Sequence, residues 1–150
     1  MGTWHTGPFD NDTAADWCGA LDDVAPGRRI EFLREALTAV LEEDEYLDSD
    51  PAVEAIAAAA IVASQLPGGP AIDSPYAPDF LLNGGTLEIP EDLPSLALRA
   101  LDRVAGDDSE WRGLWEDADL YPDAVAALQP IRTTLERAID SRRSPGTSSP

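Results

Sequence analysis

The chain has 150 residues, 43% of them hydrophobic, and its 29 Asp and Glu residues outweigh 10 basic residues to give a formal net charge of -19. This size and hydrophobic content predict a globular domain with a sizeable core and exclude a disordered chain. The charge disfavours nucleic acid and membranes as partners, because proteins bind phosphate backbones and anionic lipids through cationic side chains.

Residues 1–17 combine two tryptophans, Trp4 and Trp17, with glycines, a proline, the only histidine and three aspartates. Large apolar rings need burial, so we expect this segment to be ordered and folded back onto the domain, unlike an ordinary frayed terminus. Asp10 or Asn11 can cap a first helix that runs to about residue 23. One face of that helix is apolar and is expected to be buried: Ala14, Trp17, Cys18 and Leu21.

A second helix is predicted from about residue 28 to residue 47, where apolar residues recur at helical spacing. Asp50 followed by Pro51 is a strong start signal for a third helix, which extends to about residue 66. This third helix is apolar almost all round, which is typical of the centre of a bundle, and its alanines allow neighbouring helices to approach closely. The stripe expected on the second helix consists of Ile30, Leu33, Leu37, Val40 and Leu41.

Residues 66–94 are rich in proline and glycine and predict a long irregular loop, a feature that is uncommon in compact domains and often functional. Within this loop we expect one helical turn at residues 79–82 and a short edge strand at residues 86–89.

Three further helices are expected after the loop. The fourth runs from residue 93 or 95 to residue 104, and Asp108-Ser109 caps the fifth. The sixth runs from Pro122 to about residue 142, with Pro130 expected to kink or divide it. Residues 143–150 are rich in serine and proline and predict a disordered tail. The sequence therefore predicts an all-α fold, a compact bundle of five to six helices in a single domain over residues 1–142.

Asp10, Asp12 and Asp16 cluster with His5 near the start of the first helix, where carboxylates and an imidazole could bind a divalent metal. The spacing does not match a calcium-binding EF-hand loop, because the loop's central glycine and final glutamate are missing. Helix capping and the helix dipole account for the aspartates better. The sequence therefore favours no metal site and no cofactor.

His5 is the only residue whose usual pKa lies near neutrality, which makes it the obvious general acid or base. No nucleophile or phosphate-binding motif accompanies it, so no catalytic residue is assigned and a non-enzyme is favoured. Cys18 lies on the face expected to be buried, where a thiol acts as a small hydrophobe. A single cysteine, no secretory signal and no apolar run long enough to cross a membrane together predict a cytoplasmic protein.

The densest acidic run falls at the predicted end of the second helix, where the helix dipole disfavours negative charge. It is either a solvated face, as acidic chains from GC-rich genomes or salty cytoplasms carry for solubility, or a surface for a basic partner. A second acidic cluster surrounds Trp111 and Trp115, which share a helix face and form either core packing, a partner-binding patch or a two-fold self-contact. The oligomeric state stays open. The acidic candidates for binding are Glu42, Glu43, Glu45 and Asp48.

The opening run MGTWHTGPFDNDTAADW resembles the start of the domain of unknown function 4259 family, whose pattern is roughly MGTWGTGPFDND-x-AADW. The alanine-rich central helix and the segment from residue 96 to Trp115 are consistent with this resemblance, which extends over residues 1 to about 140. The family brings no established activity, cofactor or catalytic residue. His5 stands where the pattern has glycine, which weakens the case for a catalytic imidazole.

The leading hypothesis is a non-enzymatic protein-binding module, of the inhibitor or immunity type, that meets a basic protein. The alternative is a small-ligand or metal-binding protein, or an enzyme, with a pocket between the N-terminal segment and the 66–94 loop. The candidate binding residues for these hypotheses are Trp4, Asp10, Asp12, Asp16, Glu42, Glu43, Glu45, Asp48, Trp111 and Trp115.

Overall fold

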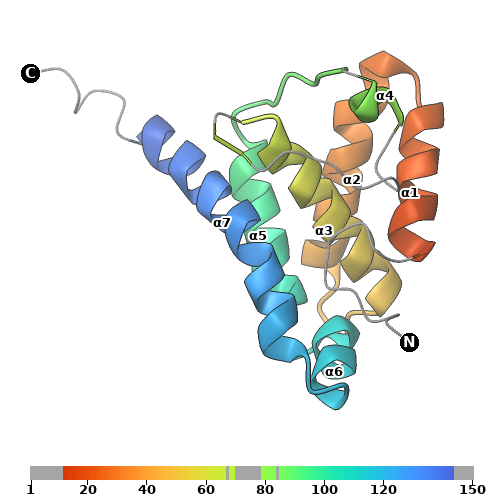
Figure 1. Cartoon of the computed structure of the whole chain (residues 1–150), viewed down its shortest axis with the longest axis vertical. Coiled ribbons are helices and arrows are strands. Elements are labelled where there is room, and N and C mark those ends of the chain that lie inside the picture. The colour runs from red at the N-terminus through yellow and green to blue at the C-terminus, as the bar shows by residue number, and fades with distance from the viewer. Residues whose placement is uncertain (1–11, 67, 70–78, 84, 144–150) are drawn as a thin grey trace, which may run out of the picture.

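The computed structural model describes residues 12–66, 68–69, 79–83 and 85–143, and it confirms the all-α fold (Figure 1). Six helices have at least eight residues, α4 is a single turn, and a 3-10 turn precedes α2. The predicted order of the N-terminal segment and the predicted disorder of the tail lie outside these residues. The helices are α1 (Asp12–Asp23), α2 (Arg29–Glu42), α3 (Ser49–Ser64), α4 (Asp79–Leu82), α5 (Leu93–Val104), α6 (Glu110–Asp117) and α7 (Tyr121–Arg143).

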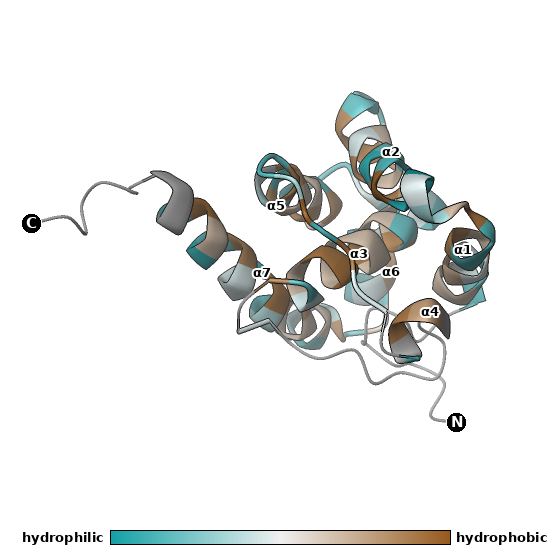
Figure 2. Ribbon diagram, turned by 90° about the horizontal axis from the view of Figure 1, so that it is seen from above, coloured by the Kyte–Doolittle hydropathy of each residue, from teal (hydrophilic) through white to brown (hydrophobic). Residues whose placement is uncertain are grey.

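Helix α3 lies at the centre of the bundle, as its all-round apolar character predicted. It packs against α1, α2, α5, α6 and α7, and Figure 2 shows it enclosed by the other helices. Every residue from 55 to 63 is buried, and most of them are alanines. A small side chain lets a neighbouring backbone come close, so several helices can share this one surface.

The predicted faces of α1 and α2 are confirmed. The four buried residues of α1 are those expected from its periodicity, and Leu33, Leu37 and Val40 of α2 point into the same core. The two helices are joined by an aromatic pair, because the Trp17 ring stacks on the Phe32 ring with centroids 5.4 Å apart.

The second helix is shorter than predicted, ending at Glu42 instead of residue 47. The chain turns extended at Glu43, with φ -77° and ψ 111°, and Leu47 then pairs with Ser109 in an isolated parallel bridge. Leu47 N–H donates to the carbonyl of Asp108 and its own carbonyl accepts from Glu110 N–H, both at 2.8 Å. These bonds replace helical ones and bury the Leu47 side chain completely, which overrides the helical spacing of the sequence.

One smaller expectation is wrong, and one of the two alternatives for Pro130 is excluded. Residues 86–89 form no strand, and the N–H of Leu87 donates instead to the Gln65 side chain at 2.9 Å. Helix α7 continues through Pro130 without division. Both Pro130 and Ala126, whose carbonyl loses its usual N–H partner, lie on the exposed side of α7, where water can solvate the freed oxygen.

The last turn of α6 closes in a Schellman motif with an aspartate at the position where glycine is usual. Asp119 N–H donates to the carbonyl of Glu116 at 3.0 Å, and Leu120 N–H donates to that of Trp115 at 2.9 Å. Asp119 has a φ of 62°, and within the described residues it is the only non-glycine residue with a positive φ. A Cβ is disfavoured in this left-handed conformation.

Replacing Asp119 with glycine should therefore raise the free energy of unfolding by about 0.5–1 kcal/mol, measured by urea denaturation. Asp117→Gly is the matched control, because it removes the same charge inside α6, where glycine lowers stability by about 0.5–1 kcal/mol. A loss of stability in both variants would show that the backbone at residue 119 is not strained.

Candidate functional site

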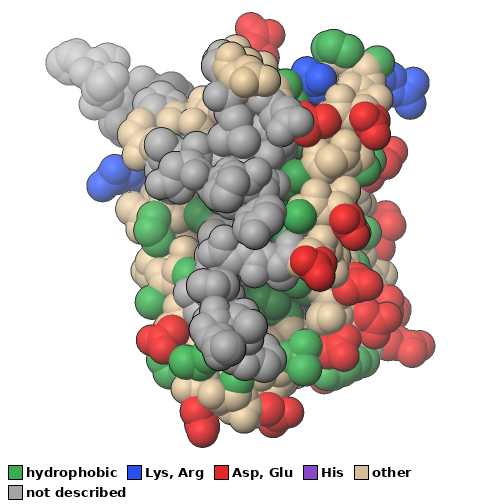
Figure 3. Space-filling view, turned by 45° about the vertical axis from the view of Figure 1, so that its right-hand side comes forward, with side chains coloured by type: hydrophobic (Ala, Val, Ile, Leu, Met, Phe, Trp, Pro, Cys, Tyr) green, Lys and Arg blue, Asp and Glu red, His purple; other side chains and the backbone are tan. Residues whose placement is uncertain are grey.

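The pairing of Leu47 with Ser109 brings together two acidic segments that lie far apart in the sequence. Residues 42–48 run from the last residue of α2 to the start of α3, residues 107–108 precede α6, and the bridge places the two segments side by side. All the acidic side chains of this surface are exposed, and Figure 3 shows acidic side chains crowding the lower right of the molecule while the visible arginines lie higher up. This surface, the acidic end, consists of Glu42, Glu43, Asp44, Glu45, Asp48, Asp102, Asp107 and Asp108.

A groove of about 300 Å³ runs between the two segments, and Arg103 is the arginine that lines it. The guanidinium of Arg103 donates to the backbone carbonyls of Glu43, Glu45 and Asp108, the shortest of these bonds being 2.7 Å to Glu45. Arg103 thus fastens the two backbones together, while the carboxylates on both sides keep pointing outward. The positive charge in the groove is used structurally.

Most carboxylates of the acidic end have no cationic partner. Asp107 pairs with Arg112 at 3.2 Å and Asp102 pairs with Arg132 at 2.7 Å. Within the described residues no ion pair forms at the remaining members, which are Glu42, Glu43, Asp44, Glu45, Asp48 and Asp108. These unpaired charges repel one another and attract cations from solution.

Two exposed apolar side chains beside the acidic end were missed by the sequence analysis. Tyr46 and Leu114 are the exposed large hydrophobic residues among those described, at 55% and 46% exposure. They lie near each other, because a Cβ built on Gly113, the neighbour of Leu114, would be 3.7 Å from the Tyr46 hydroxyl oxygen. Tyr46 stands inside the acidic run, so a tyrosine flanked by carboxylates was the signal available in the sequence.

The two tryptophans of α6 are differently placed. Trp111 is only 6% exposed, and its ring meets those of Trp115 and Tyr121 edge-on, with centroids 6.5 and 6.2 Å away. Trp115 is half-buried. Trp111 therefore belongs to the core, and the aromatic side chain that the surface offers is Tyr46.

Only some of the N-terminal candidate residues lie within the part of the chain that the structure describes. Trp4, His5 and Asp10 lie outside the described residues, as does much of the 66–94 loop. Asp12 and Asp16 are exposed on α1, with Asp12 in its first turn, where it favours the helix dipole. Across the described ranges no three acidic, histidine or cysteine side chains gather closely enough to hold a metal ion.

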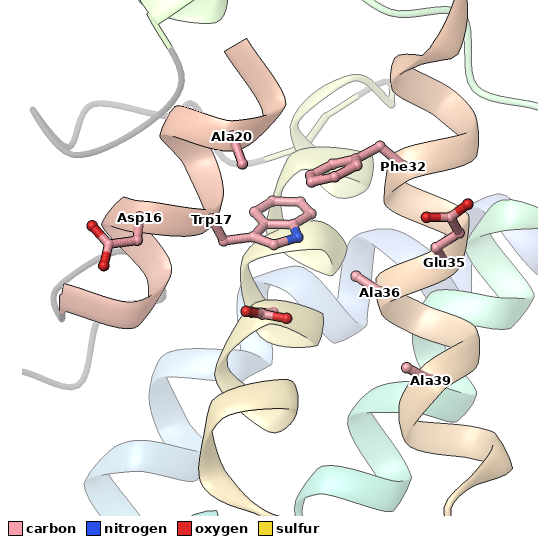
Figure 4. Close-up of a pocket in the computed structure, with 8 residues that line it drawn as sticks. Asp16, Trp17, Ala20, Phe32, Glu35, Ala36 and Ala39 are labelled. Carbon is pink, nitrogen blue, oxygen red and sulfur yellow. The ribbon is translucent and has the colours of Figure 1, made fainter. Parts of the chain in front are cut away.

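A second depression, of about 400 Å³, lies between α1 and α2 with α3 beneath it. Figure 4 shows the rings of Trp17 and Phe32 stacked across it, with Ala36 and Ala39 of α2 facing inward. The carboxylates that line it are Asp16, Glu35 and Glu54. Burial, and secondarily the charge of Asp50, raises the pKa of the Glu54 carboxyl above its ordinary value.

Cys18 is buried on α1 behind this depression and is not a reactive centre. Its side chain is 1% exposed. Burial, with a smaller contribution from the nearby charge of Asp22, raises the pKa of the thiol to about 12. A thiol that holds its proton so strongly is a poor nucleophile at neutral pH.

The comparisons with known proteins give a family and no activity. The model of the family described as Domain of unknown function (DUF4259) matches residues 2–128. Neither the curated proteins nor the solved structures contain a match to this chain. No helix in the described part of the chain combines the length and the apolar character needed to cross a membrane.

The Cys18 thiol should resist labelling in the folded protein and make stability fall at alkaline pH. The folded pKa of about 12 exceeds the ordinary value of 9.0, so between these values the unfolded chain binds fewer protons than the folded one, and the free energy of unfolding decreases as pH rises. The free energy of unfolding, measured by denaturant titration at several pH values, should fall more steeply with pH over this range in the parent than in Cys18→Ala. Equal slopes would mean that the thiol ionises equally in both states.

The acidic run at the end of α2 should lower stability, because negative charge opposes the helix dipole there and the last turn has no basic residue. Glu42→Lys should raise the free energy of unfolding by about 0.3–1 kcal/mol at low salt. Glu31→Lys makes the same charge change in the first turn and should lower it by a similar amount. Salt should shrink both effects, and a destabilised Glu42→Lys variant would contradict the dipole argument.

Proposed function

The chain belongs to the DUF4259 family, a domain of unknown function, and from its own surface we propose that it is a non-enzymatic, cytoplasmic protein-binding module whose acidic end contacts a basic protein. One observation carries this proposal. The Leu47–Ser109 bridge unites two acidic segments around an exposed tyrosine, and the arginine between them is engaged by backbone carbonyls.

The composition of the acidic end suits a protein interface better than a merely solvated face. Protein interfaces combine a small apolar or aromatic centre with a polar rim, and tyrosine is among the residues that contribute most to affinity. Tyr46 and Leu114 supply such a centre, and the surrounding carboxylates supply the rim. A solvated face needs no exposed hydrophobic residues at its middle.

The unpaired carboxylates act mainly on the rate of encounter. A surface of one sign attracts a partner of opposite sign over about a Debye length, about 8 Å at physiological ionic strength. The partner's cations would replace the missing ion pairs of the acidic end, and its apolar atoms would cover Tyr46. An inhibitor or immunity-type module works in this way when it masks a basic functional surface.

A photocrosslinker at position 46 tests the proposal in the native cytosol. Replacing Tyr46 with a benzoylphenylalanine should link the chain to one stoichiometric basic protein, whereas the same group at exposed Glu136 of α7 should not. The partner, once identified, is purified for kinetics with the unmodified chain.

Charge reversal of the acidic end should then slow association by about tenfold or more at low salt, because steering is lost. The test variant is Glu43→Lys/Asp44→Lys/Glu45→Lys, whose sites lie outside any helix. Its control, with the same change of net charge on other exposed sites, is Glu88→Lys/Glu136→Lys/Asp140→Lys. Equal slowing in both triple variants, or equal crosslinking at positions 46 and 136, would assign the charge to solubility and end the proposal.

A further inference from the structure

The hollow between α1 and α2 exists because both helices pack on α3 while their own backbones stay apart. Each contacts α3 extensively, while their own backbones scarcely approach. The Trp17–Phe32 stack bridges the gap and leaves a depression of about 400 Å³ beside it (Figure 4). That volume lies in the range of small-molecule sites.

Three polar groups that face this hollow have no protein partner among the described residues. Trp17 is 7% exposed, yet no hydrogen bond of its indole N–H is found within the described residues, and Figure 4 shows the nitrogen turned toward α2 across the hollow. This nitrogen is not among the fully buried, unpartnered polar atoms of the described residues, so its N–H opens on the hollow and is available to an acceptor there. Glu35 and Glu54 line the same space, and within the described chain neither carboxylate has an ion pair.

The arrangement selects the chemistry of a ligand. The carboxylates come from α1, α2 and α3 and do not gather as a metal-ligating group in the described chain, and Asp16 points away from the rings to the rim in Figure 4. Two separated carboxylates beside aromatic faces suit an ammonium group with a carbon skeleton, which gains ion pairing and cation–π attraction together. The free indole N–H adds a requirement for a neutral oxygen acceptor in the same molecule.

We propose that this hollow binds a small organic cation that carries both an ammonium group and a neutral oxygen acceptor, as amino alcohols and amino sugars do. The ammonium lies between Glu35 and Glu54, the oxygen accepts from the Trp17 N–H, and the methylene or ring carbons cover Phe32 and Ala36. A lysine residue of a peptide has the same chemistry, through its side chain and its backbone carbonyl. This site shares no residue with the acidic end, so the two proposals can fail separately.

The Trp17 indole N–H gives a direct readout by ¹H–¹⁵N NMR of the full chain, whose tryptophans number 4. The resonance that disappears in Trp17→Phe is assigned to Trp17. Glucosamine and ethanolamine should shift it saturably with millimolar or tighter dissociation constants. n-Propylamine, which has the single ammonium group of ethanolamine but a methyl group in place of its hydroxyl, should bind at least about fivefold more weakly than ethanolamine. A capped lysine amide tests whether the ligand is a lysine residue of a peptide. Tighter binding of this probe than of glucosamine would support the site and assign its ligand to a peptide.

Two matched variants separate a specific site from general attraction of cations. Glu35→Gln/Glu54→Gln should weaken glucosamine binding by about tenfold, whereas Glu43→Gln/Glu45→Gln, which removes the same charge at the acidic end, should change it by less than about twofold. Trp17→Phe keeps an aromatic ring and should abolish the preference for ethanolamine over n-propylamine. This variant lacks the indole N–H, so its binding is followed through the backbone amide resonances of the hollow, and circular dichroism checks that each variant is folded. Equal weakening in the two double variants, no saturable shift up to about 50 mM ligand, or equal binding of a neutral diol would overturn the proposal.

Discussion

Every other long helix of the described chain packs on α3, and the size of the α3 side chains decides how the rest can be arranged. Because its buried surface is mostly alanine, neighbouring helices approach its backbone closely and from several directions. A central helix with larger side chains would hold its neighbours farther out and would leave room for fewer of them. Both surfaces with a proposed function follow from this packing, since α1 and α2 straddle α3 around a hollow, and the segment leading into α3 carries the acidic end.

The acidic end depends on a small amount of backbone pairing. Two N–H···O bonds at Leu47 and one from Ser49 N–H to the Glu110 carboxylate, each 2.8 Å long, connect the start of α3 to the start of α6. A completely buried Leu47 side chain secures this connection from the inside, and Arg103 secures it from the outside. The two backbone bonds and the buried Leu47 side chain are neutral, so neither pH nor salt greatly weakens this part of the connection that opposes the mutual repulsion of the carboxylates.

Periodicity was sufficient to predict which residues of the chain enter the core, but it could not predict which segments meet. The buried face of α1 and the central place of α3 follow from side-chain spacing, and the N-terminal resemblance to DUF4259 is confirmed by the match over residues 2–128. The end of α2 at Glu42 does not follow from side-chain spacing. It is set by the pairing of Leu47 with Ser109, a residue too distant in sequence to influence local helix propensity. For the same reason Tyr46 was overlooked, since its exposure beside α6 exists only after the two segments pair. The Trp17–Phe32 stack joins the predicted face of α1 to a residue of α2 that lies outside the predicted stripe, and the hollow beside it has no signature in either helix alone.

The chain contains no lysine, and at position 103 a lysine could not make the hydrogen bonds that arginine makes. A planar guanidinium with several N–H groups can hold carbonyls of three residues from two segments at once, whereas an ammonium at the end of a flexible chain cannot span them in the same way. Substitution by lysine at this position would preserve the net charge of -19 but would remove the outer of the two fastenings between the segments. The charge of this surface and the arrangement of its backbone thus depend on different residues. A relative could keep the carboxylates of the acidic end and still lack the hydrogen bonds that hold its two segments together.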